Sequence, residues 1–215
     1  MTTAALGRRT TPTALAVLAG GLPAIGLLGG LVVIVGGRWW ALMNGLDPLA
    51  VGAIFGLALA GLAVIGFRRI ATQRAVGLGR RTWIALAIGV GAGLVLVGVT
   101  LAGATIAGAT LVPGLGRPAA PFVPWAAITI IVATGEEALL RGRLFNAVRH
   151  AGGLPAAVLL TTFAFALMHV PLYGWHVVPL DFAVGLSFAG LRLATRGIVA
   201  PAAAHAVADL VTWWL

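Results

Sequence analysis

Long apolar runs are the feature that most constrains the fold of this chain. A helix needs about 20 apolar residues to cross the hydrocarbon core of a bilayer, and only helices or closed barrels satisfy their backbone hydrogen bonds there. Runs of this length recur along the whole sequence. They predict seven helical segments, at about residues 13–36, 49–67, 83–112, 123–149, 154–173, 176–195 and 198–215.

The composition leaves little room for anything but membrane helices. The 215 residues are 60% hydrophobic and 9% charged, with a mean hydropathy of +1.07. We therefore predict an all-α fold, a polytopic transmembrane bundle of about seven helices. The first apolar run is longer than the core of a signal peptide, so we expect a retained span. The absence of cysteine excludes disulfides, thiolate metal ligands and a cysteine nucleophile.

The basic residues, all of them arginines, predict the orientation of the bundle. With a cytoplasmic N-terminus, only Arg38 and Arg117 fall on the outer side. The other twelve face the cytosol: Arg8, Arg9, Arg68, Arg69, Arg74, Arg80, Arg81, Arg141, Arg143, Arg149, Arg192 and Arg196. Cytoplasmic loops of membrane proteins carry such an excess. Topology therefore explains the formal charge of +9, and no nucleic-acid partner is expected.

A few ionisable side chains lie inside the apolar segments, where they are costly and usually functional. The stretch EEALLR contains Glu136, Glu137 and Arg141. Glu137 and Arg141 are four residues apart, share a helix face, and are expected to form a structural ion pair. Glu136 is rotated by about 100° from Glu137 and has no local partner. A functional role is therefore expected for Glu136.

A predicted reversal of the chain brings a histidine level with Glu136. The stretch HAGGLP, with Gly152, Gly153 and Pro155, is typical of a sharp stop and restart between helices. Glu136 lies about 16 residues before this turn and His169 about 16 after it, so each is about 24 Å from it along its helix. Two antiparallel helices would then hold both side chains at one depth.

The last segment carries a second pair of ionisable residues. His205 and Asp209, in HAVAD, are four residues apart and share a helix face. A break at residues 195–197 returns the chain into the membrane, and His205 reaches the depth of Glu136 if the first turn projects further into the cytosol. His176 and Asp181 are expected at the membrane interface, without a site role.

Carboxylates and imidazoles at one depth can activate water in two ways. A carboxylate removed from water becomes a stronger base and can take a proton from a water molecule. Two histidines with a carboxylate are also a common set of ligands for catalytic zinc, which generates a hydroxide at neutral pH. The residues alone leave both chemistries open.

Three ordered motifs resemble those of the CPBP intramembrane proteases. They are EEALLR (136–141), FALMH (165–169) and HAVAD (205–209), which match the family patterns EExxxR, FxxxH and HxxxN or HxxxD. The family joins type II CAAX prenyl endopeptidases with bacterial bacteriocin-processing and immunity proteins, also called the ABI family. The resemblance covers about residues 123–213. It predicts a catalytic core of four helices at 123–215, after three helices without a signature at 1–122.

The resemblance implies roles for the site residues. Glu136 and His169 would position and activate the attacking water, while His205 and Asp209 would stabilise the oxyanion or complete a metal site. Glu137 is often counted with the active-site residues as well as pairing with Arg141. The tentative metal ligands are Glu136, His169, His205 and Asp209. Family members are described both as zinc metalloproteases and as glutamate proteases, and Asp209, where the eukaryotic enzymes usually have Asn, favours zinc slightly.

The leading prediction is an intramembrane endopeptidase in a multi-pass bacterial plasma membrane protein, with its cavity open to the cytoplasm. Its substrate would be a membrane-associated protein or peptide, and the arginine-rich, alanine-rich and glycine-rich composition, typical of GC-rich bacterial genomes, makes a prenylated one doubtful. The alternative is a non-catalytic immunity or regulatory protein that uses the same pocket for binding. A proton-coupled transporter is disfavoured, because no internal repeat is visible. The sequence does not predict the oligomeric state.

Overall fold

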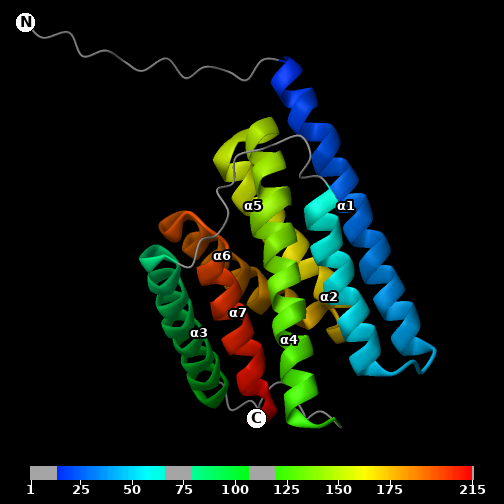
Figure 1. Ribbon diagram of the computed structural model, residues 1–215, viewed down its shortest axis with the longest axis vertical. Helices are drawn as coiled ribbons and strands as arrows, with labels where there is room; N and C mark the ends of the chain where they lie inside the picture. Colours follow the sequence, from blue (N-terminus) through cyan, green and yellow to red (C-terminus); the bar gives the residue numbers. More distant parts are fainter. Residues whose placement is uncertain (1–13, 66–78, 107–119, 215) are drawn as a thin grey trace, which may run out of the picture.

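The computed structural model describes residues 14–65, 79–106 and 120–214, and these parts of the chain are helical throughout, apart from short connections. The described residues form seven α-helices, which pack as a bundle (Figure 1). Their bounds are Ala14–Met43 (α1), Pro48–Ile65 (α2), Arg80–Ile106 (α3), Phe122–Glu137 (α4), Phe145–Tyr173 (α5), Val178–Thr195 (α6) and Val199–Val211 (α7). A π-helix, Ala138–Leu144 (η2), joins α4 to α5, and 3₁₀ turns occupy Trp175–Val177 (η3) and Thr212–Trp214 (η4). The predicted all-α bundle of about seven helices is confirmed.

Five stretches of the described chain are long and apolar enough to cross a membrane. They are Gly21–Met43, Pro48–Ile65, Arg80–Gly103, Phe122–Tyr173 and Trp175–Thr195. The fourth has 52 residues, more than one crossing needs, and it is folded back on itself. The chain is therefore a multi-pass membrane protein. Its orientation stays a prediction, and six of the arginines on which it depends lie outside the described residues: Arg8, Arg9, Arg68, Arg69, Arg74 and Arg117.

The reversal expected at HAGGLP is present within α5. Gly153 has φ 81° and ψ −177°, a conformation that breaks the helix there. Only glycine adopts this region of backbone space without strain. The following Pro155 suits the first turn of a new helix. The segment ending at Gly153 and the segment ending at Tyr173 therefore run in opposite directions, as predicted.

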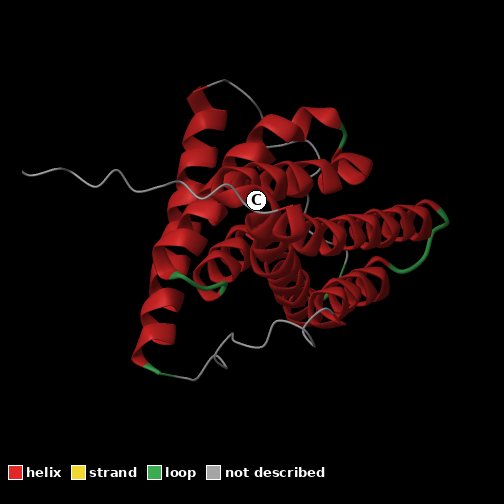
Figure 2. Ribbon diagram, turned by 90° about the horizontal axis from the view of Figure 1, so that it is seen from above, coloured by secondary structure: helices red, strands yellow, loops and turns green. Residues whose placement is uncertain are grey.

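Small residues let the helices approach closely. A side chain added at Gly135 of α4 would lie 2.6 Å from the carbonyl oxygen of Gly56 in α2. One added at Gly93 of α3 would lie 2.7 Å from the carbonyl oxygen of Ala204 in α7. Glycine at these positions permits backbone contact between neighbouring helices, which is how membrane helices commonly pack. Figure 2 shows the bundle from above, with the helices crossing one another at different angles.

The two ends of the bundle differ in side-chain chemistry. At one end, Phe122 and Trp125 of α4 meet Trp213, with ring centroids 5.2 and 5.0 Å apart, and Trp214 lies 5.3 Å from Phe122. We call this the aromatic end. Helices α2 and α4 lie side by side and both begin at this end, so the connection between α1 and α2 also lies here (Figure 1). The opposite arginine end holds the reversal at Gly153, the break between α6 and α7, and arginines that include Arg80, Arg81, Arg149, Arg192 and Arg196.

Candidate active site

A π-helical turn follows directly after the two adjacent glutamates. Glu136 and Glu137 end α4, and the chain widens into the π-helix η2. The sequence analysis expected an unbroken α-helix here. Within η2 the carbonyl oxygen of Arg141 accepts a hydrogen bond from Nε of Arg192 in α6, at 3.0 Å. Short π-helical turns occur mostly inside α-helices and frequently at functional sites.

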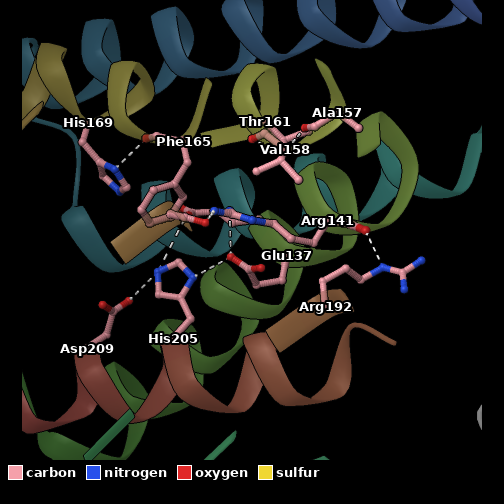
Figure 3. A network of polar contacts seen from close by, with 12 residues as sticks. Glu137, Arg141, Ala157, Val158, Thr161, Phe165, His169, Arg192, His205 and Asp209 are labelled. Carbon is pink, nitrogen blue, oxygen red and sulfur yellow. Dashed lines mark hydrogen bonds and ion pairs between the residues drawn. The ribbon is translucent and has the colours of Figure 1, made fainter. Parts of the chain in front are cut away.

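The Glu137–Arg141 ion pair is fully buried. Nη1 of Arg141 donates to Oε1 of Glu137 at 3.0 Å, and both side chains are 0% exposed. Nη2 donates to the carbonyl oxygen of Gly185 in α6, also at 3.0 Å. The guanidinium lies 4.7 Å from the ring centre of Phe165 and 5.5 Å from that of Phe188. The pair thus ties η2 to α5 and α6 (Figure 3).

His205 of α7 is surrounded by three carboxylates. Its Nδ1 lies 3.3 Å from Oε1 of Glu137, and its Nε2 lies 3.5 Å from Oδ2 of Asp209 and 3.7 Å from Oε2 of Glu136. The ring stacks on Phe188, with centroids 5.0 Å apart. Figure 3 shows Glu137 and Asp209 on opposite sides of the imidazole. Glu137 therefore contacts both Arg141 and His205. The sequence analysis predicted its pairing with Arg141 but not its contact with His205.

His169 of α5 has a different partner. Its Nδ1 lies 3.0 Å from the carbonyl oxygen of Phe165 and 3.3 Å from Oδ2 of Asp181 in α6. The sequence analysis gave Asp181 no site role. A signal was present: His169 and Asp181 lie about equally far from the turn at Gly174, so antiparallel helices place them at one depth. This is the reasoning that matched Glu136 with His169.

One cavity of about 810 Å³ joins these groups. Glu136, His169, His205 and Asp209 all line it, so the structure brings four of the predicted site residues to one space. Glu137 does not line the cavity and reaches it only through His205. The chain has five acidic residues. The cavity is lined by four of them: Asp47, Glu136, Asp181 and Asp209.

The cavity reaches the aromatic end of the bundle. Its lining includes residues from the helix connections and helix termini at that end: Asp47, Pro48, Ala120, Pro121, Val177 and Thr212. Towards the arginine end, the site is covered by Leu140, Arg141 and Phe188, each 0% exposed. The predicted topology puts the aromatic end outside the cell. The expected cytoplasmic opening and the predicted orientation are therefore incompatible.

Glu136 has a free acceptor at the edge of this cavity. Its side chain is 2% exposed, and Oε2 has no hydrogen-bond partner among the described residues. As for a metal, no three His, Asp or Glu side chains of the described chain are grouped closely enough to hold one ion in this conformation. The Nδ1 atom of His169 faces Asp181. Zinc thus stays a prediction, and we derive no step through a metal.

Fold and site together define a class, a polytopic helical membrane protein with carboxylates and histidines converging on a buried cavity. The family model described as type II CAAX prenyl endopeptidase Rce1-like matches residues 118–211. This match supports membership of the CAAX protease family, which the three motifs predicted. The family is one of intramembrane proteases, which implies a peptide substrate. No curated protein and no solved structure matches the chain.

Proposed function

We propose that the chain hydrolyses a peptide bond of a membrane-associated protein or peptide, using water activated by Glu136. The observation that carries this proposal is the buried Oε2 of Glu136, which lacks a hydrogen-bond partner among the described residues and faces a cavity shared with two histidines. A free acceptor in a roomy cavity that also holds other polar side chains is a place where water binds. The 3.7 Å between this oxygen and Nε2 of His205 is too long for a direct hydrogen bond and suits a water that contacts both.

Each step of the reaction balances with these groups. The water oxygen attacks the carbonyl carbon of the substrate while its proton passes to Glu136, and the carbonyl oxygen becomes an oxyanion. The carbon–nitrogen bond then breaks, and Glu136 returns the proton to the leaving amine. A positioned general base of this kind contributes about 10² to 10⁴ in rate.

His205 is the group best placed to stabilise the oxyanion. With both ring nitrogens protonated, it donates Nδ1–H to Glu137 and presents Nε2–H to the cavity, where a developing negative charge would accept it. Asp209, 42% exposed and 3.5 Å from Nε2, is a positioning residue for the ring and a poor oxyanion donor itself. An ionised carboxylate can only accept hydrogen bonds, so the imidazole and not Asp209 is the donor to the oxyanion.

His169 completes the site from the other wall. Donation of Nδ1–H to the Phe165 carbonyl and to Asp181 directs Nε2 away from that pair. Nε2 is then free to hold the attacking water or the substrate carbonyl. Asp181 acts as a positioning residue, since it touches the histidine and not the reacting atoms.

Loss of one carboxylate oxygen tests the proposal. Membranes from cells that express the wild-type chain, Glu136→Gln or the control Asp47→Asn would be compared for new peptide termini by mass spectrometry, with a farnesylated CAAX-type peptide as a defined second probe. With the wild type and with Asp47→Asn, we expect new peptide termini in the membranes or cleavage of the farnesylated peptide. With Glu136→Gln we expect neither. The same termini in all three samples would contradict the mechanism. A toxin-immunity phenotype that survives Glu136→Gln would favour the non-catalytic binding protein instead.

A further inference from the structure

We propose that Arg38 binds a carboxylate of the substrate peptide and thereby selects peptides that carry a carboxylate within a few residues of the cleaved bond. That carboxylate is either the C-terminus of the peptide or the side chain of an Asp or Glu residue. This role rests on the proposed function, because it concerns the substrate of that site. Arg38 lies in α1, outside residues 118–211 that match the family model.

Arg38 points into the bundle. Its guanidinium lies 4.4 Å from the ring centre of Phe55 in α2, a side chain that is 3% exposed. Among the described residues that line the cavity, Arg38 is the one arginine. An arginine that anchors a helix at the membrane interface would instead extend to the headgroups. An arginine that faces a cavity inside a membrane protein is expected to have a partner and a function there.

The described part of the chain supplies no acceptor for this guanidinium. Nε of Arg38 is buried without a hydrogen-bond partner among the described residues, and none of their carboxylates forms an ion pair with it. The other carboxylates of the cavity have contacts elsewhere. Asp47 accepts from a backbone N–H at the start of α2, and Asp181 and Asp209 each contact a histidine. A peptide carboxylate would match the planar guanidinium with two parallel hydrogen bonds.

Arg38 lies about one helical turn from Glu136 along the bundle. Next to Phe55, which Arg38 contacts, a side chain added at Gly56 would lie 3.0 Å from the backbone of Val132 in α4. Glu136 follows four residues later, a rise of about 6 Å. The charges of Arg38 and Glu136 are close enough to interact. Since an extended peptide advances about 3.3–3.6 Å per residue, a carboxylate held at Arg38 leaves a bond at Glu136 within a few residues.

This contact would give the site its selectivity. Four carboxylates line the cavity, and they would repel an acidic peptide if no cation opposed them. A bidentate contact with Arg38 offsets that repulsion and fixes which peptide bond reaches Glu136. Arg38 is then a specificity-determining residue that touches the substrate and takes no part in the proton transfer.

Peptides that differ by one carboxylate test this site. A fluorescent farnesylated CAAX-type peptide without Asp or Glu would be made with a free C-terminus, as its C-terminal amide, and as the amide with one added Glu. Binding to purified protein in detergent would be measured by fluorescence anisotropy, with Glu136→Gln as the background so that bound peptide stays intact. Into this background we would introduce Arg38→Gln, Arg38→Lys and the control Arg149→Gln, an exposed arginine outside the cavity lining.

We expect a peptide with a carboxylate to bind at least about tenfold more tightly than the plain amide. Arg38→Gln should abolish this preference, Arg38→Lys should keep part of it, and Arg149→Gln should leave it unchanged. A preference for the free C-terminus identifies the terminal carboxylate as the ligand, and a preference for the peptide with Glu identifies a side chain. The comparison of peptides with Arg38 in place requires no Arg38 variant to fold.

Equal binding of the three peptides, or binding of none, would overturn the proposal. A preference that survives Arg38→Gln would overturn it too, as would an equal loss of affinity for all three peptides in Arg38→Gln, which would indicate a structural role or a contact with lipid phosphate. The readout is binding and not cleavage. Failure of Glu136→Gln to affect cleavage would therefore reject the proposed function and leave the carboxylate site standing.

Discussion

The site contains two ion pairs, Glu137–Arg141 and His169–Asp181, that differ in burial. The comparison shows which contact holds the fold together and which can rearrange. The first is 0% exposed on both sides, whereas the second is 15% and 20% exposed at the cavity wall. Arg141 is also fixed by Gly185 and by two aromatic rings. A buried pair must stay intact, because breaking it leaves a charge without compensation. A partly exposed pair is screened by water and can rearrange when a substrate arrives.

The largest effect on stability is expected from breaking the buried pair. Arg141→Met leaves the Glu137 carboxylate buried without its guanidinium, and removal of one partner from such a pair typically costs about 3–5 kcal/mol. Thermal unfolding in detergent and the yield of folded protein would measure this loss. The control Arg149→Met changes an exposed arginine and should stay within about 0.5 kcal/mol. Equal unfolding curves for the two variants would show that the buried pair is not needed for the fold.

A smaller effect is expected when both charges are removed. The double variant Glu137→Gln with Arg141→Met leaves no uncompensated charge, and the new amide oxygen can still accept from Nδ1 of His205. Its unfolding temperature should therefore lie above that of Arg141→Met alone. A double variant that loses as much stability as the sum of the two single variants would mean that the residues are not coupled.

The smallest effect on stability is expected at the cavity wall. Asp181→Asn keeps an acceptor for Nδ1 of His169 and loses only a partly exposed charge, worth less than about 1 kcal/mol. Its unfolding curve should match the wild type, while cleavage slows because His169 is held less firmly. Asp181→Leu, which removes the acceptor, should slow cleavage further at similar stability. Unchanged cleavage in both variants would remove Asp181 from the site.

Local spacing and composition predicted most of the bundle and much of the site. The glycines of HAGGLP predicted the reversal, and equal distances from it matched Glu136 with His169. The i, i+4 spacings placed Glu137 beside Arg141 and His205 beside Asp209. The π-helix was not predicted, and the residue that bonds its Arg141 carbonyl, Arg192, lies 51 residues later in the chain. Contacts of His205 with both glutamates depend on how α4 and α7 pack. That the cavity reaches the aromatic end could be seen only once the helix connections that line it were known.

The central claim is that Glu136 activates water in this cavity, and one rate comparison tests it most directly. Wild type, Glu136→Gln and Asp47→Asn would be purified, matched for folded protein by their unfolding curves, reconstituted in liposomes and compared on one cleaved peptide. Both variants exchange a carboxylate at the cavity for an amide. We predict that Glu136→Gln lowers the rate by about 10² to 10⁴, while Asp47→Asn, an exposed residue where the cavity reaches the aromatic end, leaves it close to the wild type. A Glu136→Gln enzyme as fast as the wild type would contradict the account.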